Sequence, residues 1–174
     1  LYLEGELRAR QGKKPEARAA YERAATLEPR SVATVSAPIT LDLSDGKVGP
    51  ARTRAEQLLS KSPKNPAALI LGAKTYATIN DFMRAETLLR QAIDLDPARP
   101  DAYGMLANLY LVQGKLDEAL AKFKDAAAHD PKSVGAQIMI AEVLVRQGRR
   151  AEAKDAYRRA LEIDAEAPVA ANNL

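Results

Sequence analysis

The chain of 174 residues contains no cysteine, no tryptophan and only one histidine. The lack of cysteine excludes disulfides, thiol nucleophiles and cysteine-ligated metal sites. Because aromatic residues make up 5% of the chain and hydrophobic residues 47%, the core must consist mainly of Ala, Leu, Ile and Val. Alanine has the highest helix propensity, and its small side chain lets helices approach closely. The composition therefore favours closely packed helices.

Motifs for catalysis and cofactor binding are also lacking. The single histidine, His129, leaves no second histidine for a hydrolase triad or for the paired spacing of a zinc protease. It stands at the predicted end of a helix, where a cation complements the helix dipole, so we expect a capping role at the surface. Neither Gly-x-Gly-x-x-Gly nor a phosphate-binding loop pattern occurs. We expect no enzymatic activity, no cofactor and no metal.

The charge pattern argues against nucleic acid as a partner, and the lack of long apolar runs argues against a membrane span in this segment. The chain has 26 basic and 23 acidic residues, a net charge of +3, with both signs interleaved along the sequence. A nucleic-acid-binding protein more often concentrates its basic residues on one stripe. No stretch approaches the roughly 18 apolar residues that a membrane span needs. The chain begins at Leu1 within a predicted helix, and we expect it to be a piece of a longer protein.

Three residue types recur every 34 residues along the chain. The prolines on this period are Pro29, Pro63, Pro97 and Pro131. The alanines are Ala17, Ala51, Ala85, Ala119 and Ala153. The glycines are Gly12, Gly46, Gly114 and Gly148, with Asn80 in the remaining place. Agreement of three residue types on one period excludes chance and predicts a helical repeat protein of five units.

The period and the residue types resemble the tetratricopeptide repeat family, whose units are helix–turn–helix hairpins of 34 residues. The unit at 100–133 carries the clearest pattern. It consists of Tyr103, Leu106, Ala107, Tyr110, Gly114, Ala119, Phe123, Ala126 and Pro131. The resemblance covers nearly the whole chain and implies an all-α fold, a right-handed α-solenoid of antiparallel helix pairs.

Each recurring residue has a physical role in such a hairpin. The periodic alanines lie in the second helix, where a larger side chain would push the pair apart. Glycine or asparagine at the bend tolerates a left-handed backbone, and the closing proline ends the second helix. The predicted first helices span 1–11, 32–44, 66–79, 100–113 and 134–147. The predicted second helices span 15–28, 49–61, 82–95, 116–129 and 150–163.

These hairpins predict one domain over residues 1–174. The expected units are 1–31, 32–65, 66–99, 100–133 and 134–167, and residues 168–174 begin a further or capping helix. The second unit departs from the pattern, because Pro38 falls inside its first helix. We expect a kink near Ala37–Pro38. Two interpretations stay open. The repeat sequence has diverged at a position where a kink is tolerated, or the kink changes the local curvature of the solenoid and shapes a groove.

By resemblance to the family, the first helices line a concave face that binds a partner. The matching partner-binding residues are Ile70, Lys74, Ala77, Asp101, Asn108, Leu111, Ile138, Glu142 and Val145, with Ala67, Gly104 and Gly135 at neighbouring positions. The amide of Asn108 can pair with a peptide backbone as donor and acceptor, although an exposed asparagine is also tolerated without a role. Met105 and Met139 are either adaptable contacts or core filling.

The family's basic clamp for the C-terminal carboxylate of chaperone tails is not reproduced here, so such tails are disfavoured as ligands. The predicted groove is apolar with a few polar side chains, which suits a helix or a hydrophobic peptide as the ligand. The leading hypothesis is therefore a non-catalytic scaffold that binds a protein or peptide partner in this groove.

Two alternatives stay open. The chain could be a regulatory or substrate-recruiting arm of a larger enzyme such as a glycosyltransferase. It could also self-associate through residues 168–174, as an assembly module for bacterial secretion or polysaccharide export. Dense Ala and Arg usage is typical of bacterial repeats. The compartment is then the bacterial cytoplasm, or the periplasm or membrane surface as part of a longer chain, and the analogy selects none of these.

Overall fold

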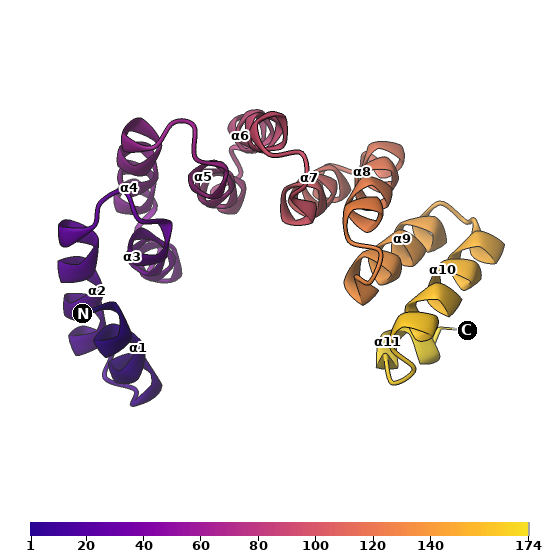
Figure 1. Ribbon diagram of the computed structural model, residues 1–174, viewed down its shortest axis with the longest axis horizontal. Coiled ribbons are helices and arrows are strands. Elements are labelled where there is room, and N and C mark those ends of the chain that lie inside the picture. The colour runs from indigo at the N-terminus through magenta and orange to yellow at the C-terminus, as the bar shows by residue number, and fades with distance from the viewer. Residues whose placement is uncertain (174) are drawn as a thin grey trace. The chain divides into compact units, whose positions relative to one another are not determined.

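The computed structural model describes residues 1–173, which form eleven α-helices and no strand (Figure 1). The helices are α1 (Tyr2–Arg10), α2 (Lys14–Leu27), α3 (Val32–Ser44), α4 (Val48–Lys61), α5 (Pro66–Thr78), α6 (Phe82–Leu95), α7 (Pro100–Val112), α8 (Leu116–His129), α9 (Val134–Arg146), α10 (Arg150–Ile163) and α11 (Pro168–Ala171). The predicted all-α fold is confirmed. Each of the ten predicted helices occurs within one residue of its expected bounds.

The chain divides into two compact units, Leu1–Leu95 and Asp96–Leu174. In the first unit, α1 packs on α2, α3 on α4 and α5 on α6, and the contacts α2–α3 and α4–α5 join successive pairs. In the second unit, α7 packs on α8 and α9 on α10, and α8 contacts α9. The organisation of all five hairpins as one continuous domain stays a prediction.

The periodic alanines lie where helices cross closely, as predicted. Ala51, Ala85 and Ala119 are 0% exposed, and Ala17 and Ala153 are 2% exposed. Each belongs to the second helix of its pair. A methyl group is the largest side chain that fits without moving the partner helix, because protein interiors are already close-packed.

The turns inside the hairpins repeat one geometry. Gly114 has a φ of 74°, and Asn80, which fills the corresponding place in the third hairpin, has a φ of 62°. After α7 the N–H of Lys115 donates to the carbonyl of Tyr110 at 2.9 Å, and that of Gly114 donates to Leu111 at 3.1 Å. These two bonds form the Schellman motif, which requires a left-handed residue at this position. The predicted left-handed bend is confirmed.

Helix α3 continues through Pro38 without a break. Pro38 is buried, and its ring cannot donate the hydrogen bond that residue 38 would otherwise make to the preceding turn. Thr34, one turn earlier, donates its hydroxyl to the carbonyls of Glu28 and Ser31. The expected kink at Ala37–Pro38 stays a prediction, whereas the continuity of the helix across the proline is observed.

The second helix pair contains a buried carboxylate that the sequence pattern did not reveal. Asp42 on α3 is 1% exposed, at the position that Tyr76 and Tyr110 occupy in later units. Arg18 Nη1 donates to Asp42 Oδ1 at 2.7 Å, and Arg54 Nε donates to Oδ2 at 2.8 Å. Burial raises the pKa of Asp42, but the hydrogen bonds from the two guanidinium groups outweigh burial and hold the pKa below its usual value.

The charge cluster extends from Asp42 to two further acids. Arg54 Nη2 donates to Glu22 Oε1 at 2.7 Å, and Arg18 Nη2 donates to Asp45 Oδ2 at 2.9 Å. Because Arg18 and Glu22 lie on α2, Asp42 on α3 and Arg54 on α4, the cluster links the first hairpin to the second. Ionic hydrogen bonds thus link successive hairpins here, as the bond from the Tyr76 hydroxyl to Glu56 does between the third and second hairpins.

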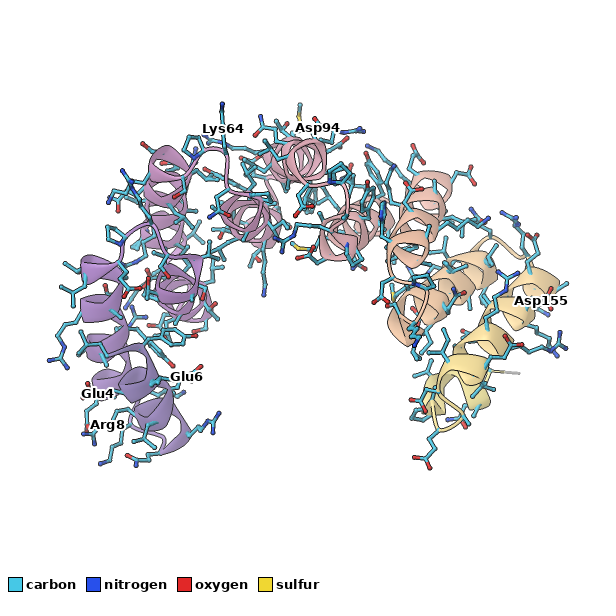
Figure 2. The ribbon with its side chains drawn as sticks, in the orientation of Figure 1. Glu4, Glu6, Arg8, Lys64, Asp94 and Asp155 are labelled. Carbon is cyan, nitrogen blue, oxygen red and sulfur yellow. The ribbon has the colours of Figure 1, made fainter. Side chains whose placement is uncertain are left out.

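Other charged side chains project from the helix surfaces of both units (Figure 2). Lys64, Asp94 and Asp155 are exposed. Arg158 pairs with Asp155 at 2.8 Å, and both side chains are more than 60% exposed. Exposed pairs of this kind add little to stability. The interleaved charges of the sequence therefore correspond mostly to solvated helix faces.

The predicted C-terminal segment begins a short helix, α11, which packs on α10 and buries Ala167 and Ala170. Val169 on the same turn is 43% exposed. Leu174, the last residue of the predicted segment, lies outside the described residues.

Candidate functional site

A groove opens between helices α7 and α9 in the second unit. Its volume is about 350 Å³. The lining residues come from α7, the end of α8, the following turn and the start of α9. They are Pro100, Asp101, Gly104, Asn108, Phe123, Ala126, Asp130, Ser133, Gly135, Ala136 and Met139, and we call this set the α7–α9 groove. It is a shallow channel between two first helices, with the second helix of the fourth hairpin as its floor.

Two glycines open the walls of the α7–α9 groove. Gly104 lies in the middle of α7 and Gly135 at the start of α9. A Cβ atom built at either residue would meet no atom within 4 Å apart from the adjoining backbone of its own helix, so packing does not demand glycine at these places. Glycine inside a helix costs about 0.5–1 kcal/mol relative to alanine. Neither backbone conformation nor packing therefore requires glycine at these two positions.

The floor of the groove is apolar. Phe123 and Ala126 on α8 are 2% and 4% exposed, and Met139 on α9 is half-buried. Met139 therefore lines the groove, whereas Met105 is not one of its lining residues. A flexible thioether beside small side chains can adapt to apolar groups of different shape.

The polar groups of the groove lie along its edges. Asn108 is exposed on α7, so its amide is accessible to a ligand as donor and acceptor. Asp101 accepts two hydrogen bonds from Arg99, from Nη2 at 2.8 Å and from Nε at 3.2 Å. Those bonds hold the pKa of Asp101 below its usual value although burial opposes them. Asp130, in the turn after α8, accepts a hydrogen bond from the backbone N–H of Lys132 at 3.3 Å.

The structure brings together two of the nine predicted partner-binding residues in this groove, Asp101 and Asn108, along with the neighbouring Gly104 and Gly135. The other four predictions in this unit lie on α7 or α9 but do not line the groove; they are Leu111, Ile138, Glu142 and Val145. The three remaining predictions lie on α5 of the first unit and are Ile70, Lys74 and Ala77. Their role in binding stays a prediction.

Sequence reasoning missed the contribution of α8 and of the turn after it. The repeat pattern includes Phe123 and Ala126 without giving either a role in binding, and it does not include Asp130. A usable signal existed for Asp130, because Asp96 and Asp164 stand one period before and after it. These three turns each place an aspartate just before the next first helix, whereas the corresponding residue before the third hairpin is Ser62.

His129 has a contact beyond its predicted capping position. It is the last residue of α8 and its ring stacks on that of Tyr103, with centroids 4.7 Å apart and an interplanar angle of 22°. Lys122 Nζ lies 5.8 Å from the centroid of the Tyr103 ring. The histidine thus contributes to packing between α7 and α8.

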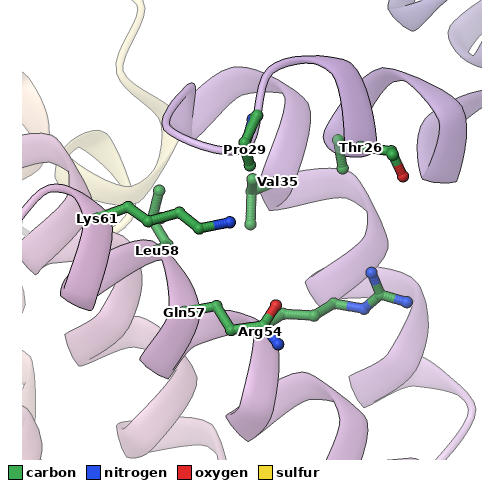
Figure 3. A pocket seen from close by; sticks show the side chains of 8 residues that line it. Thr26, Pro29, Val35, Arg54, Gln57, Leu58 and Lys61 are labelled. Carbon is green, nitrogen blue, oxygen red and sulfur yellow. The ribbon is translucent and has the colours of Figure 1, made fainter.

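The first unit has a separate, smaller pocket of about 230 Å³ between α2, α3 and α4 (Figure 3). Its apolar side is formed by Val35, Leu58 and Pro29, and its polar side by Gln57 and Lys61 among others. Arg54 also lines this pocket, but its guanidinium is already bonded to Asp42 and Glu22. The sequence pattern did not predict this pocket, because its residues come from three helices of two hairpins.

Two further findings concern membranes and metals. Across the described part of the chain, every helix is too short or too polar to cross a bilayer. Over the same residues, no three histidine or acidic side chains gather in a way that could hold a metal ion.

Three family models, each for a tetratricopeptide repeat, match the chain. They cover residues 1–31, 70–134 and 111–172. These matches leave out residues 32–69, the stretch that contains Pro38 and Asp42. No curated protein matches the chain significantly.

Several solved structures resemble the chain over most of its length. MamA has 22% identity and a TM-score of 0.73, covering 93% of this chain and 95% of its own. TTC0263, a thermophilic TPR protein of Thermus thermophilus, has 20% identity and a TM-score of 0.75 over 97% and 93%. YrrB, described as a TPR protein with an unusual peptide-binding site, has 18% identity and a TM-score of 0.67 over 97% and 87%. Similarity at this level of identity concerns the fold.

Proposed function

Since the chain belongs to the tetratricopeptide repeat family, we propose that it is a non-catalytic scaffold that binds an extended segment of a partner protein in the α7–α9 groove. One observation carries the proposal: Gly104 and Gly135 face open space on two neighbouring first helices, where neither packing nor backbone geometry requires glycine. An accessible helix backbone beside an exposed asparagine suits a ligand whose own backbone approaches closely.

The two accessible glycines favour an extended segment over a helix as the ligand. Their bare backbone lets a ligand backbone approach closely, whereas a helix would present only its side chains to the groove. An extended segment can place alternate side chains on the apolar floor and leave its backbone amides for Asn108. The peptide-binding description of YrrB, which has the same fold, is consistent with this use.

The test is to fill the groove without disturbing the fold. We expect Gly104→Leu to weaken binding of a peptide selected on the wild-type chain from a random synthetic library by about tenfold or more, because the new side chain occupies the ligand's volume. Thermal stability should stay equal or rise, since the substitution relieves a helical glycine. Binding is measured by fluorescence anisotropy and stability by circular dichroism.

Gly49→Leu is the matched control, because Gly49 lies in the first turn of α4 and also faces open space, outside the groove. It should leave peptide affinity unchanged. Equal affinity of the wild type and Gly104→Leu for the selected peptide, or failure to select any peptide, would contradict the groove assignment.

The competing function is self-association through the C-terminal end of the chain. It is favoured by the exposure of Val169, an apolar residue on α11. It predicts that the mass measured by light scattering rises with protein concentration and that Val169→Glu abolishes the rise. A constant monomer mass would leave peptide binding as the function to pursue.

A further inference from the structure

The α7–α9 groove is acidic, although the chain as a whole is basic. Two aspartates, Asp101 and Asp130, line it, and its lining residues include no lysine or arginine. The whole chain has 26 basic residues against 23 acidic ones. The local balance of charge in the groove is therefore the reverse of the overall balance.

The two aspartates differ in how far their charge is already compensated. Both oxygens of Asp101 are bonded to the guanidinium of Arg99. This bidentate pair satisfies the carboxylate and cancels most of its field. Asp101 consequently offers a ligand little net attraction.

Asp130 has no such compensation. Within residues 1–173, its carboxylate accepts a hydrogen bond from a neutral backbone N–H, that of Lys132, and forms no ion pair with a cationic side chain. The residue is half-buried, so its charge is less screened than that of a fully exposed acid. An uncompensated carboxylate at the edge of an apolar channel is a site of complementary charge for a cation.

The corresponding turn in the next hairpin offers a comparison. Asp164 stands 34 residues after Asp130, and its Oδ1 accepts a hydrogen bond from the backbone N–H of Glu166 at 2.9 Å. Asp164 is exposed and is not part of the groove. The turn itself therefore explains an aspartate at both positions, but of the two only Asp130 lines the groove.

We propose that the α7–α9 groove selects a partner segment in which an arginine or lysine stands next to an apolar residue, the cation pairing with Asp130 and the apolar side chain contacting Phe123, Ala126 and Met139. This inference rests on the proposed function and adds to it the chemistry of the segment.

The experiment compares two pools of fluorescein-labelled synthetic octapeptides with randomised flanks. One pool has a central Arg-Leu pair and the other a central citrulline-Leu pair, since citrulline keeps the shape of arginine without its charge. With the wild-type chain of residues 1–174, we expect the arginine pool to bind about fivefold to tenfold more tightly by fluorescence anisotropy. The preference should shrink as salt is raised, because a partly exposed ion pair is screened.

Asp130→Asn tests the residue directly. Asparagine can accept the same bond from the Lys132 N–H, so the turn should persist while the charge is lost. We expect the preference for the arginine pool to disappear in Asp130→Asn and to remain in the control Asp164→Asn.

Equal binding of the two pools to the wild type, or an undiminished preference in Asp130→Asn, would overturn the inference about charge. If Gly104→Leu still abolished that binding, the proposed groove would stand without the cation. Binding of the arginine pool that Gly104→Leu leaves unchanged would overturn the groove itself.

Discussion

Among single residues, Asp42 shows how one position of the repeat can be filled in two physically different ways. In the third hairpin Tyr76 occupies this position, and its hydroxyl donates to Glu56 of the preceding hairpin at 3.1 Å. In the second hairpin Asp42 instead accepts hydrogen bonds from Arg18 and Arg54. A buried carboxylate is tolerated only while its cationic partners are in place, because an unpaired buried charge is strongly destabilising.

We expect Asp42→Asn to lower the free energy of unfolding at pH 7 by about 1.5–3 kcal/mol, the contribution of a hydrogen bond to a charged group. The substitution keeps the size of the side chain and leaves two half-buried guanidinium groups without their shared acceptor. Urea denaturation followed by circular dichroism measures the change. Asp155→Asn is the control, because it removes an aspartate from an exposed pair and should cost little.

The contribution of Asp42 should also depend on pH. Its pKa in the folded chain lies below the unfolded value, which is about 3.9. The folded state therefore binds fewer protons, and the stabilisation is fully present above the unfolded pKa and lost as the pH falls through the folded pKa. We expect the difference in unfolding free energy between wild type and Asp42→Asn to shrink as the pH is lowered from 6 to 3. A difference that stays constant over this range would contradict the assignment.

At the level of helices, the closeness of each pair depends on one alanine in its second helix. Ala119 on α8 is 0% exposed, whereas Ala121 on the same helix is exposed. Both residues are alanines with the same helix propensity, and they differ in whether they lie on the buried or the exposed face of α8. They therefore separate the effect of packing from the effect of helix formation.

We expect Ala119→Leu to destabilise the chain by about 1–3 kcal/mol, because added methylene groups in a close-packed site force backbone shifts. Ala121→Leu should change stability by less than about 0.5 kcal/mol, as is usual at the surface. Thermal melts of both variants measure the contrast. Equal melting temperatures would mean that the periodic alanines do not mark the helix crossings.

The helices themselves were predictable from the sequence, because their signals are local and repeated. Bends at Gly114 and Asn80 and the closing Pro131 recur at one spacing, so each hairpin confirms the register of the others. The charge cluster of Asp42 was not predictable, since its members come from three helices and obey no local pattern. Asn108 was predicted to line the groove by resemblance to the family, which places first helices there, whereas Phe123 lies on a second helix and the resemblance gives it no such role.

For the whole molecule, the division into two compact units has a thermodynamic consequence. Stability in repeat proteins is approximately a sum of terms for each repeat and each interface between neighbours. Asp42 belongs to the first unit and Ala119 to the second. Substitutions at the two residues should therefore change the free energy of unfolding independently of each other.

We expect the free energy of unfolding of the double variant Asp42→Asn with Ala119→Leu to be lower than that of the wild type by the sum of the two decreases measured for the single variants, within about 0.5 kcal/mol. Urea denaturation of the wild type, the two single variants and the double variant completes the cycle. A larger deviation from additivity would indicate that the two units share a cooperative core.

The buried cluster around Asp42 also bears on how this chain can change over generations. Tyrosine at that position requires no arginine, whereas aspartate requires both Arg18 and Arg54, which lie on different helices. Replacing either arginine leaves the buried carboxylate of Asp42 with one cationic partner instead of two, and replacing Asp42 removes the acceptor that the two arginines share. The three residues should consequently be inherited together: related chains are expected to carry all of them, or an uncharged residue at position 42 and free variation at the other two.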